Sequence, residues 1–287
     1  MRDAHGADSS GCIARRPFYH GAAGLARFLV AVLLGLGFAA APAPGQTVFS
    51  NVELLDIMVK AYPEFLERHE DGLLIWKDGT RMPFDDGIAN KDFATRLDKP
   101  SLKDQFYAPY PLTSAAQSPE VDIDPGRVRF EPLFAKMYGD CRKREVEGNL
   151  VEIVWLPKKS GKKIKVSKVN GVAAALERIS AELDELPAAF DKYLWPPAGT
   201  YNCRPIAGTQ RLSAHGAGIA IDISTRHAHY WYWARKAGAG RISYQNEIPP
   251  EIVVIFEQHG FIWGGKWYHF DTMHFEYRPE IIAAGVK

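Results

Sequence analysis

An alternating run at residues 213–223 carries the strongest local signal in the chain. It reads Ser-Ala-His-Gly-Ala-Gly-Ile-Ala-Ile-Asp-Ile, so isoleucines alternate with small or acidic residues. Because the side chains of a strand point alternately to its two faces, this pattern predicts a strand with one buried isoleucine face. Asp222 then points to the opposite face, and Gly216 and Gly218 let the backbone that carries His215 bend close to it.

A second segment, residues 261–276, offers a further metal ligand. It reads Phe-Ile-Trp-Gly-Gly-Lys-Trp-Tyr-His-Phe-Asp-Thr-Met-His-Phe-Glu, and His274 follows Asp271 by three residues. Catalytic zinc takes three nitrogen or oxygen ligands from the protein and keeps its fourth position for water. We therefore predict a zinc site formed by His215, Asp222 and His274, with Asp271 left free for proton transfer.

These two segments resemble the hallmarks of the zinc peptidases of peptidoglycan. That family includes D-alanyl-D-alanine carboxypeptidases and dipeptidases and L-alanyl-D-glutamate endopeptidases, and it shares a fold with the hedgehog signalling domain. Its SxHxxGxAxD hallmark and its acidic residue three before a histidine are met by Ser213, His215, Gly218, Ala220, Asp222, Asp271 and His274. The resemblance covers about residues 170 to 287 and implies an α+β fold of the hedgehog/DD-peptidase type.

The resemblance also implies the roles of two further side chains. Asp271 would take a proton from the attacking water and return it to the leaving amine. Arg204, in the sequence Tyr-Asn-Cys-Arg-Pro, stands where relatives carry an arginine that stabilises charge near the zinc. A guanidinium holds oxyanions and carboxylates with two parallel hydrogen bonds. The alternative for Arg204 is a surface arginine without a role in the site.

The branch of the family is indicated by the residues before His274. The Gly-Phe-x-Trp-Gly-Gly-x-Trp run, followed by an aspartate, resembles the L-alanyl-D-glutamate endopeptidases. A D-alanyl-D-alanine carboxypeptidase is the alternative within the family. A catalytically silent, zinc-containing module that binds the cell wall is an alternative of another class, and the acidic residue at Asp271 argues against it.

Residues 1–45 have the features of a signal peptide. Arginines precede an uncharged apolar run at residues 28–41, and small residues near its end supply candidate cleavage positions. We expect an exported protein, periplasmic or associated with the cell wall, that meets the membrane only through this segment. An uncleaved anchor is the competing interpretation.

The charge balance argues against nucleic acid as a partner. The formal net charge is +1, and no nucleic-acid-binding motif accompanies it. Removal of residues 1–45 would leave 31 basic and 32 acidic residues, which is close to neutral. The partners that the resemblance and the predicted export imply are the stem peptides of peptidoglycan.

Two cysteines remain after the predicted signal segment. Cys141 and Cys203 form an even pair in a chain bound for an oxidising compartment, where disulfides persist. We predict a bridge between them. The alternative is a pair of buried free thiols.

The rest of the chain is divided by its local patterns into an N-terminal extension, residues 46–130, and a peptidase domain, residues 131–287. Prolines and aromatic residues scattered through the extension favour a segment that wraps the downstream domain over a separate small domain. Apolar spacing and turn residues predict helices at 51–70, 172–186 and 250–259, a hairpin at 73–84, and strands at 151–156 and 163–169.

Four further features of the sequence have more than one interpretation. His227 and His229 could hold a second metal or be structural. Glu276 shares strand parity with His274 and could orient that ligand, bind a substrate amine, or be structural. Trp263 and Trp267 could line the groove or belong to the core. The lysines at residues 158–168 could touch anionic polymers or protect an exposed strand edge.

Overall fold

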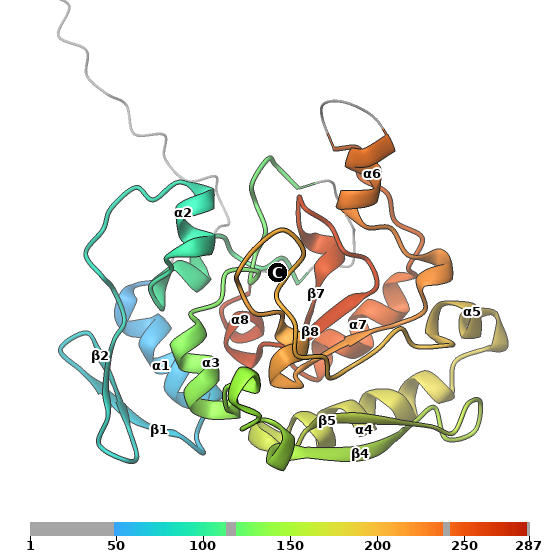
Figure 1. The fold of residues 1–287 in the computed structure, drawn as a ribbon, viewed down its shortest axis with the longest axis horizontal. Coiled ribbons are helices and arrows are strands. Elements are labelled where there is room, and N and C mark those ends of the chain that lie inside the picture. The colour runs from blue at the N-terminus through green and yellow to red at the C-terminus, as the bar shows by residue number, and fades with distance from the viewer. Residues whose placement is uncertain (1–48, 113–118, 238–241, 286–287) are drawn as a thin grey trace, which may run out of the picture. The chain divides into compact units, whose positions relative to one another are not determined.

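A computed structural model describes residues 49–112, 119–237 and 242–285, and these belong to one compact unit that spans residues 45–287. The predicted signal peptide at residues 1–45 lies outside the described residues. Among the described residues, no helix combines the length and the apolar character that a membrane crossing requires. Helices and small antiparallel sheets alternate, so the fold is α+β as predicted (Figure 1).

The central element is a three-stranded antiparallel sheet in the order β6-β8-β7. The strands are β6 (Ala220–Asp222), β7 (Phe261–Trp263) and β8 (His274–Tyr277). The isoleucines around β6 are buried, as the alternating pattern predicts. Helix α7 (Pro250–Gln258) packs on β7, and the Phe256 ring stacks on that of Phe275 in β8. The helix predicted at residues 250–259 is thus confirmed.

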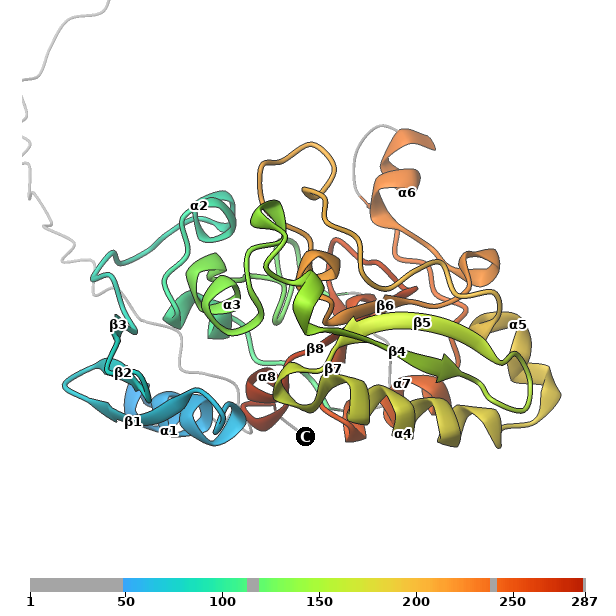
Figure 2. The ribbon, with the colours of Figure 1, turned by 60° about the horizontal axis from the view of Figure 1, so that its bottom comes forward.

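A hairpin and a long helix form the other main layer. Strands β4 (Leu150–Trp155) and β5 (Lys162–Ser167) pair antiparallel, and α4 (Val172–Asp184) packs against both (Figure 2). Both strands and the helix agree with the sequence prediction. The hairpin joins the site through Gly218, whose carbonyl accepts a hydrogen bond from the Ser167 amide at 2.9 Å.

The helix predicted at residues 51–70 is wrong in its second half. Helix α1 (Asn51–Ala61) begins with a capping box between Ser50 and Glu53 and ends before Pro63. Proline disfavours helical backbone in the residue before it and lacks an amide hydrogen, so the helix stops there. The following residues form the strand β1 (Leu66–Glu70) instead.

A small antiparallel sheet follows α1 in the order β1-β2-β3. The hairpin predicted at residues 73–84 is confirmed as β2 (Leu73–Trp76) and β3 (Arg81–Pro83), with the turn at Asp78 and Gly79. The remaining α-helices of the described residues are short: α2 (Phe93–Asp98), α3 (Glu131–Tyr138), α5 (Asp191–Leu194), α6 (Trp231–Ala237) and α8 (Pro279–Ala283).

The predicted N-terminal extension packs directly on the C-terminal residues. Helix α1 packs on α8, and the Tyr62 hydroxyl donates to Glu280 at 2.5 Å. The Tyr110 hydroxyl accepts from the Trp263 amide at 2.9 Å and donates to Glu257 at 2.6 Å. These buried contacts cross the boundary predicted at residues 130 and 131, which stays a prediction.

Candidate metal centre and active site

Strand pairing brings Asp222 and His274 together. Residue 222 on β6 lies opposite residue 274 on β8, so both side chains point to the same face of the sheet. Nδ1 of His274 lies 3.0 Å from Oδ1 of Asp222. The two predicted ligands, 52 residues apart in sequence, are therefore neighbours in space.

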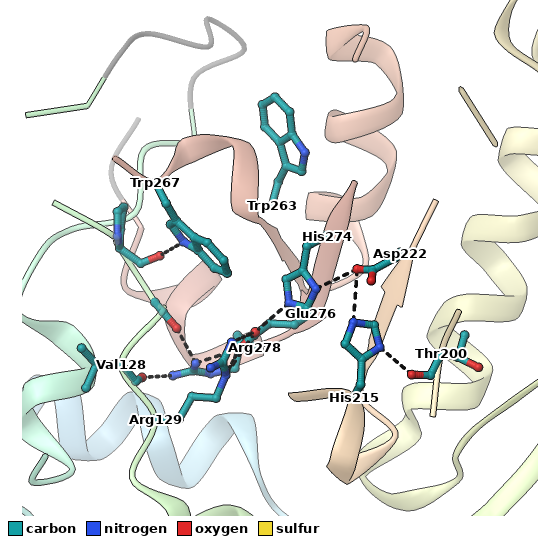
Figure 3. A network of polar contacts seen from close by, with 12 residues as sticks. Val128, Arg129, Thr200, His215, Asp222, Trp263, Trp267, His274, Glu276 and Arg278 are labelled. Atoms are coloured by element: carbon teal, nitrogen blue, oxygen red, sulfur yellow. Dashed lines mark hydrogen bonds and ion pairs between the residues drawn. The ribbon is translucent and has the colours of Figure 1, made fainter. Parts of the chain in front are cut away.

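His215 reaches the same carboxylate oxygen from a 3₁₀ turn, η6 (Ala214–Ala217) (Figure 3). Its Nδ1 hydrogen-bonds the Thr200 carbonyl, so Nδ1 carries the proton and Nε2 keeps its lone pair. Nε2 is buried and lies 3.1 Å from Oδ1 of Asp222, yet it makes no hydrogen bond. One atom from each of His215, Asp222 and His274 lies within 4.8 Å of the others.

Glu276 supports His274 from the side away from Asp222. Its Oε2 lies 3.1 Å from Nε2 of His274, and its carboxylate also binds Arg129 and Arg278 (Figure 3). Since a carboxylate can only accept, Nε2 donates to Glu276 and Nδ1 donates to Asp222 as long as His274 is protonated. A metal ion held by His274 and Asp222 would replace the proton on Nδ1, whereas Nε2 would keep its bond to Glu276. Of the roles considered for Glu276, orientation of a ligand is the one that this contact supports.

The electrostatics of the cluster favour a positive charge at its centre. Burial lowers the pKa of His274, but hydrogen bonds to Asp222 and Glu276 outweigh it and raise that pKa to about 10. Burial alone would raise the pKa of Asp222, yet His215 and His274 hold it below its usual range. The carboxylates that would keep a proton on the histidine stabilise a metal cation in the same way.

Asp271 lies at the wall of the same site without joining the three ligand atoms. Burial of its carboxyl group and the charge of Asp222 raise its pKa to about 6. Its Oδ1 is buried and has no hydrogen-bond partner. The backbone is held by a 3.0 Å bond from its amide to the Gly264 carbonyl, and a Cβ on Gly264 would lie 2.6 Å from the Asp271 carbonyl. Glycine is therefore required for this close approach.

A cleft of about 280 Å³ connects these groups to solvent. Its lining includes all three candidate ligands, Asp271 and Arg204. The Arg204 side chain is exposed, and within the described residues its guanidinium makes no hydrogen bond or ion pair. An unpaired guanidinium at the cleft can accept an anionic group of a bound molecule.

The predicted disulfide between Cys141 and Cys203 is confirmed, with the two Cα atoms 5.7 Å apart. Cys203 directly precedes Arg204 in the chain. The bridge therefore ties the loop that bears this arginine to the 3₁₀ turn at Cys141–Lys143.

Comparison with known protein families supports the same segment. Residues 207–277 match the model of a family described as D-alanyl-D-alanine carboxypeptidase. The predicted family resemblance is confirmed. The match spans about a quarter of the chain and contains His215, Asp222, Asp271 and His274, whereas Arg204 lies just outside it. No curated protein and no solved structure matches the chain.

The family match supports a peptidase related to peptidoglycan. The family consists of zinc peptidases, and the nitrogen and oxygen donors of the cluster are those that zinc prefers. Neither the match nor the cluster distinguishes an endopeptidase from a carboxypeptidase, because the two share their metal ligands.

Sequence reasoning missed two arginines of the cleft. Arg127 and Arg129 line it from the segment before α3, and the positive charge of Arg127 acts to lower the pKa of Asp271. Arg129 binds the carboxylate of Glu276 through its Nε atom at 2.9 Å. Both lie in a stretch without helical or strand periodicity, and the sequence carries no signal that would have pointed to them.

The other histidines considered as ligands stay apart from the cluster. His227 and His229 each lie 3.0 Å from one oxygen of Glu247, on the surface. This arrangement supports a structural role for the two histidines over a second metal site. Of the two tryptophans, Trp267 lines the cleft, whereas Trp263 is buried in the core and donates to the Thr272 carbonyl at 2.9 Å.

Proposed function

We propose that the protein is a zinc metallopeptidase that hydrolyses peptide bonds in the stem peptides of peptidoglycan, with the specificity of an L-alanyl-D-glutamate endopeptidase. The observation that carries the proposal is the convergence of His215, Asp222 and His274. Beside them lies Asp271, whose Oδ1 has no hydrogen-bond partner. The family match supports the substrate class. We also propose the hedgehog/DD-peptidase fold, which the family resemblance implies, and export, which the signal-peptide features of residues 1–45 indicate.

The three candidate ligands fit zinc in their donor chemistry. Nε2 of His215 is a buried nitrogen without a hydrogen bond, which is costly unless a further partner satisfies it. The Thr200 carbonyl and Glu276 hold the two imidazoles in the tautomers that a metal requires. When bound, zinc would polarise the scissile carbonyl and lower the pKa of the attacking water.

The remaining steps belong to side chains of the protein. A carboxyl group with a pKa of about 6 is ionised near neutral pH and accepts a proton easily, so Asp271 serves as general base at its free Oδ1. The protonated acid then donates to the leaving amine. Arg204, whose guanidinium is unpaired, would bind the oxyanion or a substrate carboxylate.

Two alternatives remain for this site. A D-alanyl-D-alanine carboxypeptidase would use the same residues, but its cleft would be closed beyond the C-terminal residue of the substrate peptide. A silent wall-binding module would have no need of Asp271, and burial of an acid oxygen without a partner is costly in a protein that does not use it. The second alternative is therefore the weaker one.

The deciding experiment compares wild type with Asp271→Asn on defined stem peptides, with products read by mass spectrometry. The variant should keep its zinc and its thermal transition and lose about 10²- to 10⁴-fold in rate. The control is Asp56→Asn, an exposed aspartate that contacts His69 outside the site. Near-normal turnover in Asp271→Asn would exclude it as the base, and loss of zinc would make it a ligand. Cleavage that produces only free D-alanine would favour the carboxypeptidase.

A further inference from the structure

A second cleft continues from the active-site cleft. It has a volume of about 380 Å³ and shares Arg127, Arg129 and Ile206 with the first. One wall is the loop that leads to His215, and it includes Arg211. The N-terminal extension contributes residues 97–100, Arg127, Arg129 and Phe130 to the lining. A peptide chain bound at the metal ligands could therefore extend into this cleft.

Three arginines, Arg127, Arg129 and Arg211, line this second cleft. The Arg211 side chain is mostly buried, and burial together with the nearby charges of Arg127 and Arg129 lowers its pKa. Its Nε is buried without a hydrogen bond, although it lies 3.3 Å from Oδ1 of Asp98. The Arg211 guanidinium stays charged although it is buried near two other positive charges. A bound anion would therefore lower the free-energy cost of this burial and of the repulsion among the like charges.

The carboxylates of the protein do not supply that anion. Asp124 and Glu276, which are fully buried, bind Arg127 and Arg129 on the side of the core. Glu131 uses Oε1 to accept from the Leu212 amide at 2.8 Å. The side chain of Asp98 is 66% exposed, so water screens its contact with Arg211. The residues that line the second cleft carry four positive charges and two negative ones, Asp98 and Glu131, and Arg211 is the arginine among them without a buried carboxylate partner.

The loop that carries Arg211 is tied to the catalytic residues. Backbone hydrogen bonds join Ile206 to Arg211 at 2.8 Å and Ser213 to Arg204 at 3.1 Å, which makes the loop a short antiparallel pair. Its second arm runs directly into η6 with His215. Arg204 at the active site and Arg211 in the second cleft are therefore presented by one ordered loop.

We propose that the second cleft is an anion subsite in which Arg211, with Arg127 and Arg129, binds a free carboxylate of the substrate peptide near the scissile bond. The inference rests on the proposed peptidase function and adds the class of substrate: an acidic peptide with a carboxylate outside the reacting group. It also gives the N-terminal extension a role, because that extension supplies Arg127, Arg129 and other residues of the lining.

The test measures kcat/KM for a stem peptide with its free carboxylates and for versions in which each carboxylate in turn is amidated. Wild type should prefer the free peptide by about 10- to 100-fold at one of these positions, as expected for a charge-assisted, two-pronged contact. In Arg211→Gln this ratio should fall toward one, mainly through KM. Arg211→Lys should keep part of the preference, because it retains the charge without the planar fork.

The matched control is Arg144→Gln, which removes an exposed arginine that pairs with Glu147 and lines neither cleft. It should keep the preference of wild type. Equal losses on free and amidated peptides in Arg211→Gln would mean a merely structural role and overturn the proposal. So would a wild type that cuts all the peptides equally well.

Failure of the proposed function would be seen separately, as a wild type that cuts none of the peptides. Binding of the same peptides, measured by calorimetry, then tests the subsite alone. Tighter binding of the free peptide by wild type than by Arg211→Gln would uphold the subsite. Equal binding of free and amidated peptides would overturn it.

Discussion

His274 contacts two carboxylates through the two nitrogens of its ring: Nδ1 lies 3.0 Å from Asp222 and Nε2 lies 3.1 Å from Glu276. The first carboxylate is a candidate ligand, and the second is fully buried behind the ring. Arg129 and Arg278 both bind Glu276, so it links the metal cluster to the N-terminal extension and to the end of β8.

Glu276→Gln should weaken both the metal site and the fold. Loss of an outer partner of a ligand histidine typically lowers metal affinity by about 10- to 100-fold. Arg129 and the fully buried Arg278 would also lose their shared anion, which costs about 3–5 kcal/mol of unfolding free energy. Zinc competition with a chromophoric chelator and urea unfolding measure the two effects. Glu247→Gln, which alters an exposed carboxylate bound to two histidines, is the control. Unchanged zinc affinity in Glu276→Gln would contradict its orienting role.

His215→Ala and His274→Ala should each lose the zinc that we expect at about one ion per chain. Because metal binding and folding are linked, both variants should also unfold at a lower temperature than wild type. Elemental analysis and thermal unfolding check the two expectations. His229→Ala, on the surface beside Glu247, should retain the metal. Full metal content in both ligand variants would remove the assignment.

The local elements and the members of the candidate metal site could be predicted because their signals are short-range. The isoleucine alternation places Asp222 on the face away from the core, and the two motifs name His215 and His274 directly. That the two motifs meet was an inference from the family resemblance, since spacing alone does not determine which strands pair.

The contacts of the N-terminal extension could not be predicted, because they depend on tertiary packing. Arg127 and Arg129 lie in a proline-rich stretch, and only the folded chain brings them to Glu276 and the cleft. The role of Glu276 cannot be predicted from its sequence position either, because it depends on contacts with Arg129, His274 and Arg278 in the folded chain. The wrong second half of the helix predicted at residues 51–70 has a different cause, because Pro63 is visible in the sequence and marks where α1 ends.

Removal of the Cys141–Cys203 bridge should lower the free energy of unfolding of the protein but leave the zinc site folded. The bridge joins residues 62 apart in sequence, and in the chain-entropy model a loop of this size contributes about 4 kcal/mol to stability. The double variant Cys141→Ser/Cys203→Ser should show this loss in urea unfolding and keep its zinc. Two free thiols in the denatured, unreduced wild type would contradict the bridge itself.

Asp124 should make the stability of the protein sensitive to acid. Burial raises the pKa of this carboxyl, but the hydrogen bond from His269 and the charge of Arg127 outweigh burial and lower it. The amide and Nδ1 of His269 both lie 2.9 Å from the carboxylate, and Nη1 of Arg127 lies 2.6 Å away. Asp124 thus ties the N-terminal extension to the segment that carries Asp271.

The sign of the effect follows from the lowered pKa. An unfolded chain binds a proton at Asp124 near pH 4, at a higher pH than the folded protein does, so the contribution is complete above that pH and is lost as the pH falls through the folded value. Each unit of lowering corresponds to about 1.4 kcal/mol. Asp124→Asn should therefore be less stable than wild type at pH 7, and the difference should stay full down to about pH 4 and shrink as the pH falls below it. Urea unfolding across this range measures both proteins, and a difference that stays constant with pH would show that the carboxylate charge does not stabilise the contact.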